Sequence, residues 1–236
     1  MKELFFESID STNTYLKDHY EELDDGCFVR ADLQTKGKGR NGRKWQSIKG
    51  ENLTFSLLVK DKELIGNYSR LSVNSAYLIL KVLEGYGIED LSIKWPNDVY
   101  VKGKKICGIL LEAVSKKEIE CLIIGIGLNA NQTDFEGDYL IEPTSIALEL
   151  KRKIDLLKLK DEIYDSLLDG LKQDHYQQIK GYDYLKGKSA VAEIHGGSRS
   201  IKVIGIDEDY SLKIIADEKE TNILSGEISF HLERGV

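Results

Sequence analysis

The strongest constraint on the fold is a block of three apolar runs, at residues 99–101, 106–114 and 119–130. Two polar tetrapeptides, KGKK and SKKE, separate these runs. Connections this short join neighbouring strands in antiparallel fashion, because a parallel pair needs a long crossover. The block therefore predicts an antiparallel meander of three strands.

The rest of the first 185 residues adds helices and further strands. Asp10, Ser11 and Asn13 are good N-cap residues, which predicts a short helix beginning at this point. The segments expected to be strands are 27–34 and 52–59, and a second helix is expected over about 68–84. A third helix is periodic, and its inward residues are expected to be Ile154, Leu157, Ile163, Leu167 and Leu171. The predicted class is α+β, with a mixed, mostly antiparallel sheet covered by helices.

The pattern changes from Lys186 onward. Five short β-like runs follow one another, SAVAEIH, SIKVIGID, SLKIIAD, TNILS and EISFHL, with tight turns between them. Short strands at such spacing are typical of a small barrel. We therefore expect two domains, at 1–185 and 186–236.

Composition and charge exclude several classes of protein. The formal net charge is −7, and a general nucleic-acid binder needs a broad cationic surface. No segment reaches the roughly 18 to 20 apolar residues of a membrane span. Cys27, Cys107 and Cys121 are widely spaced in apolar surroundings, which indicates buried thiols in a reducing compartment. We expect a cytoplasmic protein without nucleic-acid or membrane partners.

One basic loop stands out against the acidic whole. Residues 34–50 contain six Lys or Arg, several glycines and no acidic residue. Glycines allow backbone N–H groups to turn toward an anion, and the cations supply charge and forked donors. The spacing fits neither a P-loop nor a convincing dinucleotide fingerprint. Taken alone, the loop is either a solvated surface loop or an anion-binding site.

Two other polar clusters accompany the basic loop. Trp95-Pro96-Asn97-Asp98 is a turn whose oxygens cap the backbone or bind a hard cation such as Mg²⁺, and Lys105 follows just before an apolar strand. Residues 11–13, Ser-Thr-Asn, form a helix cap or a small polar binding site. The four histidines have no zinc-type spacing, and no G-x-S-x-G elbow is present. A cationic loop, a lysine and an Asn/Asp turn favour stabilisation of an anionic phosphoryl transition state.

In their order along the chain, these clusters resemble the motifs of biotin–protein ligases. The family pattern is Ser-Thr-Asn, then Gln with a Gly-Arg-Gly-Arg-x-Gly-Arg-like loop and Trp, then Lys-Trp-Pro-Asn-Asp, then Lys with Gly-Ile-Leu-x-Glu. The matching segments here are 11–13, Gln34 with 37–45, 94–98, and Lys105 with 108–112. IGIGLNAN with Asn129 and the closing SGEISF add to the likeness. The resemblance implies a class II synthetase-like catalytic fold with a C-terminal SH3-like domain.

The resemblance also implies an activity and a site. The enzyme would activate biotin with ATP and Mg²⁺ to biotinyl-5′-AMP, then transfer biotin to a lysine of a biotin carboxyl carrier protein. Lys105 and Arg40 would be catalytic, and Asn97 would contact Mg²⁺ or phosphate. The residues implied for biotin are Ser11, Thr12, Asn13, Gln34, Lys38, Gly39, Arg40, Lys105 and Gly108. Those implied for ATP and the adenylate are Arg40, Arg43, Trp45, Asn97, Lys105 and Asn129.

Two departures from the family pattern matter. Lys38 stands where the family usually has Arg, so a forked donor becomes a point charge. Ser11 comes so early that we expect no helix-turn-helix domain and no repressor role, and a homodimer is implied only by resemblance. The alternatives are a lipoate–protein ligase or octanoyl transferase of related fold, a nucleic-acid-binding module, and an inactive homologue that only binds biotin.

Overall fold

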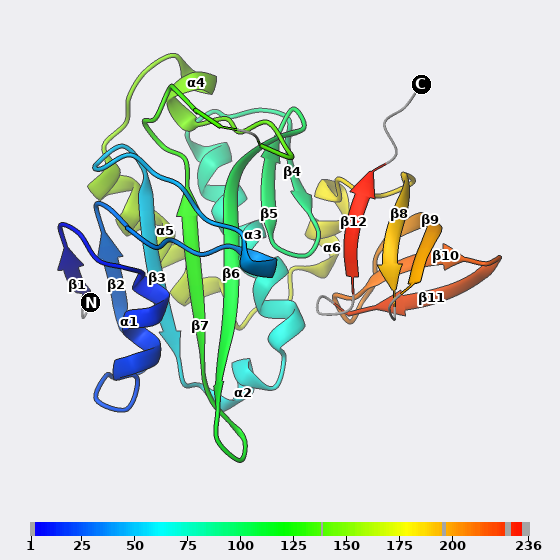
Figure 1. Ribbon diagram of the computed structural model, residues 1–236, viewed down its shortest axis with the longest axis horizontal. Coiled ribbons are helices and arrows are strands. Elements are labelled where there is room, and N and C mark those ends of the chain that lie inside the picture. Colours follow the sequence, from blue (N-terminus) through cyan, green and yellow to red (C-terminus); the bar gives the residue numbers. More distant parts are fainter. Residues whose placement is uncertain (1–2, 138, 195–196, 225–227, 233–236) are drawn as a thin grey trace.

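The computed structural model in Figure 1 describes residues 3–137, 139–194, 197–224 and 228–232. A seven-stranded sheet forms the larger part, and its strand order is β1-β2-β3-β7-β6-β5-β4. The β1–β2 pair is parallel and the other pairs are antiparallel. The strands are β1 (Glu3–Phe6), β2 (Phe28–Ala31), β3 (Leu53–Val59), β4 (Leu91–Lys94), β5 (Asp98–Val101), β6 (Lys104–Ser115) and β7 (Ile119–Leu128). The predicted meander is confirmed as β5-β6-β7.

Helices cover both faces of this sheet (Figure 1). The two long helices lie behind it in this view, and the short first helix lies in front, with the segment that follows β2 passing across the same face. Apolar side chains of the long helices complete the main core. A smaller core under the first helix contains Leu16, Cys27 and Cys121. The helices are α1 (Thr12–His19), α2 (Lys62–Ile65), α3 (Tyr68–Gly85), α4 (Ile146–Leu150), α5 (Leu156–Gly170) and α6 (Tyr176–Ile179).

Local signals explain most of these boundaries. Ser11 is extended and its hydroxyl accepts a hydrogen bond from the Thr14 N–H, so the predicted N-cap of α1 is confirmed. The inward face predicted for α5 is wrong at Leu157, which is 57% exposed. Leu159, two positions later and fully buried, lies roughly 200° around the helix, so Leu157 points to solvent. The short strands β1 and β4 were not predicted.

The C-terminal segment forms a second sheet of five antiparallel strands, in the order β11-β10-β9-β8-β12. Its strands are β8 (Ser189–Ile194), β9 (Gly197–Ile206), β10 (Leu212–Ala216), β11 (Lys219–Ile223) and β12 (Ile228–Leu232). All five predicted runs are therefore confirmed as strands, and the α+β class is confirmed with them. Residues 225–227, the SGE of the closing run SGEISF, lie outside the described residues. The domain boundary after residue 185 stays a prediction.

A buried hydrogen bond joins connections of the two sheets. The indole Nε1 of Trp95 donates a hydrogen bond of 2.9 Å to the backbone oxygen of Tyr210, which lies just before β10. The Tyr210 hydroxyl in turn donates to Asp174 at 2.6 Å. The turn after β4 is therefore tied to the β9–β10 connection of the smaller sheet.

Two further sequence expectations concern membranes and thiols. Among the described residues, no helix is both long enough and apolar enough to cross a bilayer. Cys27, Cys107 and Cys121 are all buried and free of disulfides. The expectation of buried thiols is confirmed.

Candidate functional site

A cavity of about 510 Å³ opens on the face of the seven-stranded sheet that the basic loop crosses. Every site residue expected from the sequence lines it. These residues are Ser11, Thr12, Asn13, Gln34, Lys38, Gly39, Arg40, Arg43, Trp45, Asn97, Lys105, Gly108 and Asn129. They come from α1, the basic loop, the β4–β5 turn and strands β6 and β7. Segments far apart in sequence are thus brought to one place.

The basic loop folds back on itself as an ordered hairpin. The Gly39 N–H donates to the Arg43 oxygen at 2.8 Å, and the Trp45 N–H donates to the Gly37 oxygen at 3.0 Å. A Cβ on Gly37 would collide with the Trp45 oxygen, so glycine is needed there for close approach. At the tip, Gly42 has a positive φ of 73°. The hairpin thus holds its cations around the cavity.

Strand β7 forms a flat part of the cavity wall because it presents two glycines on the same face. A Cβ on Gly127 would overlap the indole of Trp45, and one on Gly125 would overlap the carboxamide of Asn13. The indole also lies near Gly108 of β6. Trp45 therefore packs flat over the two central strands, and its Nε1 is buried without a hydrogen-bond partner among the described residues.

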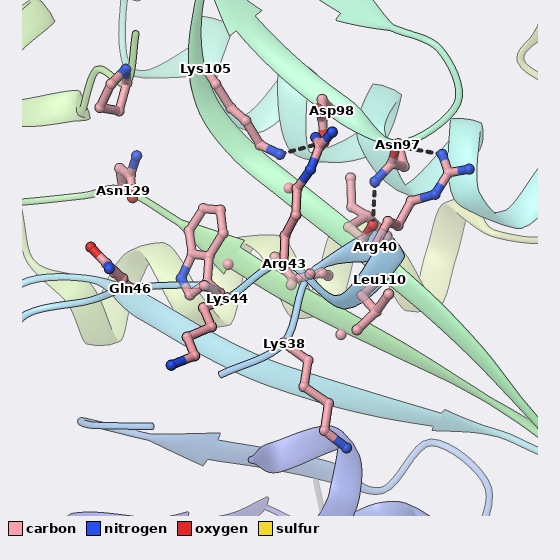
Figure 2. A pocket seen from close by; sticks show the side chains of 18 of the residues that line it. Lys38, Arg40, Arg43, Lys44, Gln46, Asn97, Asp98, Lys105, Leu110 and Asn129 are labelled. Atoms are coloured by element: carbon pink, nitrogen blue, oxygen red, sulfur yellow. Dashed lines mark hydrogen bonds and ion pairs between the residues drawn. The ribbon is translucent and has the colours of Figure 1, made fainter. Parts of the chain in front are cut away.

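The basic loop and the β4–β5 turn are linked through Asn97 (Figure 2). The Arg40 Nη1 donates to Asn97 Oδ1 at 3.0 Å, and Asn97 Nδ2 donates to the Ile109 oxygen at 2.7 Å. Arg40 is partly buried, and this desolvation lowers the pKa of its guanidinium while the charge of Asp98 opposes the shift. The carboxamide of Asn97 is thus fixed in orientation by the chain itself.

Lys105 also has a partner in the turn. Its Nζ lies 2.7 Å from Asp98 Oδ1, and the two side chains are 29% and 14% exposed. Figure 2 shows this pair on the side of the cavity opposite Lys38. The Nζ is also 5.8 Å from the ring centroid of Trp45. Lys105 is therefore held at a fixed, partly desolvated position, as its place before an apolar strand predicts.

The charge of the cavity is strongly unbalanced. Asp98 is the one carboxylate in the described part of its lining, and the cations there are Lys38, Arg40, Arg43, Lys44, Lys94 and Lys105. Burial lowers the pKa of Lys94, and Asp98 opposes this shift. A cavity with this excess of positive charge fits a polyanionic ligand.

Lys38 is directed away from the other cations. Its Nζ donates to the Thr14 hydroxyl of α1 at 2.9 Å, and Figure 2 shows the side chain extending toward that helix. Its backbone and that of Lys44 form a bridge across the hairpin. The cavity therefore receives the Lys38 backbone and stem, while the ammonium ties the loop to α1.

At the end formed by α1, the cavity is lined by neutral polar groups. Gln34 Oε1 accepts from the Thr12 N–H at 2.8 Å, and the hydroxyls of Thr12 and Ser56 are 2.6 Å apart. Asn13 Nδ2 donates to Glu112 Oε2 at 2.7 Å. This end suits an uncharged ligand group that both donates and accepts hydrogen bonds.

The opposite edge contains Asn129 and a partly apolar loop. Asn129 Nδ2 donates to the Thr144 oxygen at 3.0 Å, so this side chain is buried and fixed. The Tyr139 hydroxyl donates to Gln46 at 3.3 Å and connects this loop to the basic loop. Apolar residues from 135–143 lining the cavity mouth are Phe135, Tyr139, Leu140, Ile141 and Pro143.

The site expected for Mg²⁺ lies at Asn97 and its neighbour Asp98. In the ranges that the structure describes, no group of three or more His, Cys, Asp or Glu is arranged to hold a metal ion. Asn97 Oδ1 is engaged by Arg40. Asp98 is a carboxylate beside the cations, and Mg²⁺ commonly binds through one or two carboxylates together with substrate phosphates. The residues fit a cation that arrives with a polyphosphate.

Several residues of the site were not singled out from the sequence. Lys94 belongs to the Lys-Trp-Pro-Asn-Asp motif, so the motif was the available signal, and Asp98 of the same motif was expected only as a cap or as a ligand of a hard cation. Ser56 sits in a predicted apolar strand, and Tyr100 belongs to an apolar run, so neither pattern distinguishes them. Their place in the site depends on how the strands pair in the sheet.

The sequence matches the family model described as the biotin/lipoate A/B protein ligase family over residues 5–129. Bifunctional ligase/repressor BirA of Escherichia coli (strain K12) is 38% identical over 122 residues, which are 51% of this chain and 38% of that protein. BirA of Bacillus subtilis (strain 168) is 30% identical over 217 residues, which are 86% of this chain and 66% of that protein. The chain thus spans less than two thirds of these curated relatives.

A solved structure extends the likeness over almost the whole chain. Biotin protein ligase from Aquifex aeolicus in complex with biotin and ATP superposes with a TM-score of 0.87 at 29% identity, covering 98% of this chain and 99% of that one. The fold, the ordered motifs and the matched region agree. This chain belongs to the biotin/lipoate A/B protein ligase family.

Proposed function

We propose that this protein is a biotin–protein ligase that makes biotinyl-5′-AMP and then biotinylates a carrier protein. The observation that carries the proposal is the cavity itself. One end offers neutral hydrogen-bonding groups, the other gathers cations around Lys105, and all thirteen residues implied by the family motifs meet in it. The name and ligands of the Aquifex aeolicus structure support the same substrates.

The first step joins two anions. A carboxylate oxygen of biotin bonds to the α-phosphorus of ATP, the bond from that phosphorus to the bridging oxygen breaks, and pyrophosphate leaves with the electron pair. Lys105 lies at the cationic end of the cavity that also contains the neutral groups, and we propose that its ammonium contacts both the carboxylate and the α-phosphate. Arg40 and Arg43 neutralise the phosphates, which lowers the barrier through positioning and charge stabilisation.

The ion pair of Lys105 with Asp98 implies that phosphate binds before the carboxylate of Asp98 is released. An arriving phosphate offers Lys105 a more highly charged partner, and Asp98 is then released from the ammonium. We propose that Asp98, rather than Asn97, supplies the protein ligand to Mg²⁺, because Asn97 Oδ1 accepts from Arg40. Mg²⁺ supplies further neutralisation of the polyphosphate charge.

The second step transfers biotin to protein. The neutral ε-amine of an acceptor lysine attacks the acyl carbon, AMP leaves, and the amine loses a proton. Two relatives, from Mycobacterium tuberculosis and Paracoccus denitrificans, are named biotin--[acetyl-CoA-carboxylase] ligase. By that likeness, we propose a biotin carboxyl carrier protein domain as the acceptor. A homodimer and a cytoplasmic location, consistent with the buried free thiols, belong to the same proposal.

The competing activity is that of a lipoate ligase or an octanoyl transferase, since the matching family model covers lipoate as well as biotin protein ligases. Mass spectrometry of the small-molecule product separates the two. The protein is incubated with ATP, Mg²⁺ and either biotin or lipoate. We expect biotinyl-AMP and no lipoyl-AMP, and the reverse result would overturn the proposal.

A further inference from the structure

A chain of hydrogen bonds runs from the cavity to a carboxylate outside it. Gln34 Oε1 accepts from the Thr12 N–H at 2.8 Å and lies 3.1 Å from the Thr12 hydroxyl. The Thr12 hydroxyl lies 2.6 Å from that of Ser56, and Ser56 donates to Asn13 Oδ1 at 2.5 Å. Asn13 Nδ2 then donates to Glu112 Oε2 at 2.7 Å. Ser56 and Glu112 do not line the cavity. Any effect of Ser56 and Glu112 on ligand binding must therefore act through Thr12, Asn13 and Gln34.

The carboxylate fixes the first part of this chain. An ionised carboxylate only accepts hydrogen bonds, so the group of Asn13 facing Glu112 must be the amide nitrogen. The amide oxygen of Asn13 then faces Ser56, and an amide oxygen has no proton to give. The Ser56 hydroxyl must therefore donate its proton to Asn13 Oδ1.

The same counting fixes the groups that face the ligand. Because the Ser56 proton is used, the 2.6 Å contact between the two hydroxyls needs the proton of Thr12, which therefore goes to Ser56 rather than to the more distant Gln34 Oε1 at 3.1 Å. The Thr12 oxygen is then left with acceptor capacity only. Gln34 Oε1 takes the Thr12 backbone N–H, so the two donors of Gln34 Nε2 have no hydrogen-bond partner among the described residues.

Packing prevents the chain from rearranging. Asn13 and Ser56 are buried, and Asn13 lies directly on Gly125, where any Cβ would collide with its carboxamide. Turning the Asn13 amide over would place its oxygen against the Glu112 carboxylate with no proton between them. Because Asn13 and Ser56 have their hydrogen bonds made within this buried network, the network holds one arrangement.

We propose that Glu112 and Ser56 are positioning residues that set the donor and acceptor order of the ligand pocket. The pocket then selects a ring with an N–H donor beside a carbonyl acceptor, which is the pattern of a cyclic urea. This inference rests on the proposed function, because biotin contains such a ring. A dithiolane ring offers neither group and leaves Thr12 and Gln34 unpaired, which selects strongly against it.

The test compares Glu112→Ala with Glu112→Gln in the full chain. Titration calorimetry measures the dissociation constants for biotin, for lipoate, and for ATP in the absence of biotin. We expect Glu112→Ala to weaken biotin binding about tenfold or more, the loss of one charge-assisted hydrogen bond, and to reduce the preference for biotin over lipoate. Glu112→Gln retains an acceptor oxygen, so it restores most of the affinity. ATP binding stays unchanged in both.

A matched control is Glu120→Gln on the neighbouring strand β7. Glu120 accepts from Tyr20 at 2.5 Å and lies outside the cavity lining, so its loss leaves biotin binding unchanged. Should Glu112→Ala fail to fold, Ser56→Ala interrupts the same chain and has the same expected result.

Two results overturn the inference. If Glu112→Ala binds biotin within twofold of the wild-type affinity, the inference is wrong, while the proposed function stands. An equal loss of biotin and ATP binding assigns Glu112 a merely structural role. A wild-type protein that binds lipoate but not biotin removes the proposed function itself.

Discussion

Lys105 and Asp98 form an ion pair of 2.7 Å on adjacent strands, β6 and β5, inside the cationic cavity. Asp98 is the one carboxylate in the described lining, so this pair couples the expected catalytic lysine to the cavity's main counter-charge. A ligand phosphate that draws Lys105 away leaves Asp98 available for a metal ion. The pair thus links nucleotide binding to cation binding.

Replacing Asp98 tests this link. Asp98→Asn removes the proposed carboxylate ligand, and we expect the Mg²⁺ concentration for half-maximal adenylation to rise about tenfold. Adenylate formation measured over a range of Mg²⁺ concentrations checks this. An unchanged Mg²⁺ dependence would contradict the role given to Asp98.

Arg40 is expected to act on the nucleotide through the position that Asn97 gives it. Arg40→Ala removes a partly buried guanidinium, so we expect the KM for ATP to rise at least tenfold, with a smaller change for biotin. Lys49→Ala is the control, since Lys49 lies on the same loop but outside the cavity lining and faces Glu7 at 3.4 Å. Similar kinetics for the two variants would argue against a specific role for Arg40.

The flat wall of β7 can be tested at Gly127. Gly127→Ala places a methyl group where the Trp45 indole lies, so the ring must move. We expect a shift in tryptophan fluorescence, because Trp45 becomes more exposed while Trp95 stays buried, and a higher KM for ATP. Gly85→Ala, where a methyl group meets nothing within 4 Å, is the matched variant and should behave as wild type. Unaltered fluorescence in Gly127→Ala would contradict the packing of Trp45.

Tyr100 has a buried hydroxyl in the cavity lining, and the hydroxyl has no partner among the described residues. Burial raises the pKa of this phenol, with Asp98 adding to the shift, so it remains a protonated donor. Tyr100→Phe should leave the free energy of unfolding unchanged or raise it by about 1 kcal/mol, and weaken ATP binding.

Tyr164→Phe provides the comparison for Tyr100. The Tyr164 hydroxyl donates to the Gly26 oxygen at 3.2 Å, so its removal should lower the free energy of unfolding by about 1 kcal/mol. Urea unfolding of both variants without ligand measures the difference. A clear destabilisation by Tyr100→Phe would mean that its hydroxyl is already satisfied in the free protein.

The sequence predicted the motif-bearing residues because turns, caps and glycine spacing are local signals. Ser11 as an N-cap, the meander of β5-β6-β7 and the five C-terminal strands all follow from short-range chemistry. Ser56 carried no such signal, and Glu112 was matched only as the Glu of Gly-Ile-Leu-x-Glu, because the importance of both depends on hydrogen bonds to Asn13, 43 and 99 residues away in the chain. Leu157 was misplaced because periodicity at a helix end is defined by few residues.

The ion pair of Lys105 with Asp98 was likewise beyond the sequence. Its motif predicted a fixed lysine, but the partner depends on a register shift between β5 and β6, at Val99 and Tyr100. Similarly, the basic loop was either solvated or anion-binding until its hairpin was seen to line the cavity. Local composition indicated that the loop is cationic, and its tertiary contacts decided that it lines the cavity.

The central claim is that Lys105 drives biotin-dependent attack on ATP in this cavity. The most direct measurement is exchange of labelled pyrophosphate into ATP, with and without biotin, by the wild-type protein and Lys105→Ala. The account predicts exchange by the wild type only when biotin is present, and a loss of at least 100-fold, about 3 kcal/mol, in Lys105→Ala. Biotin binding to that variant by calorimetry confirms that it is folded. Exchange that needs no biotin, or near-normal exchange in Lys105→Ala, would contradict the account.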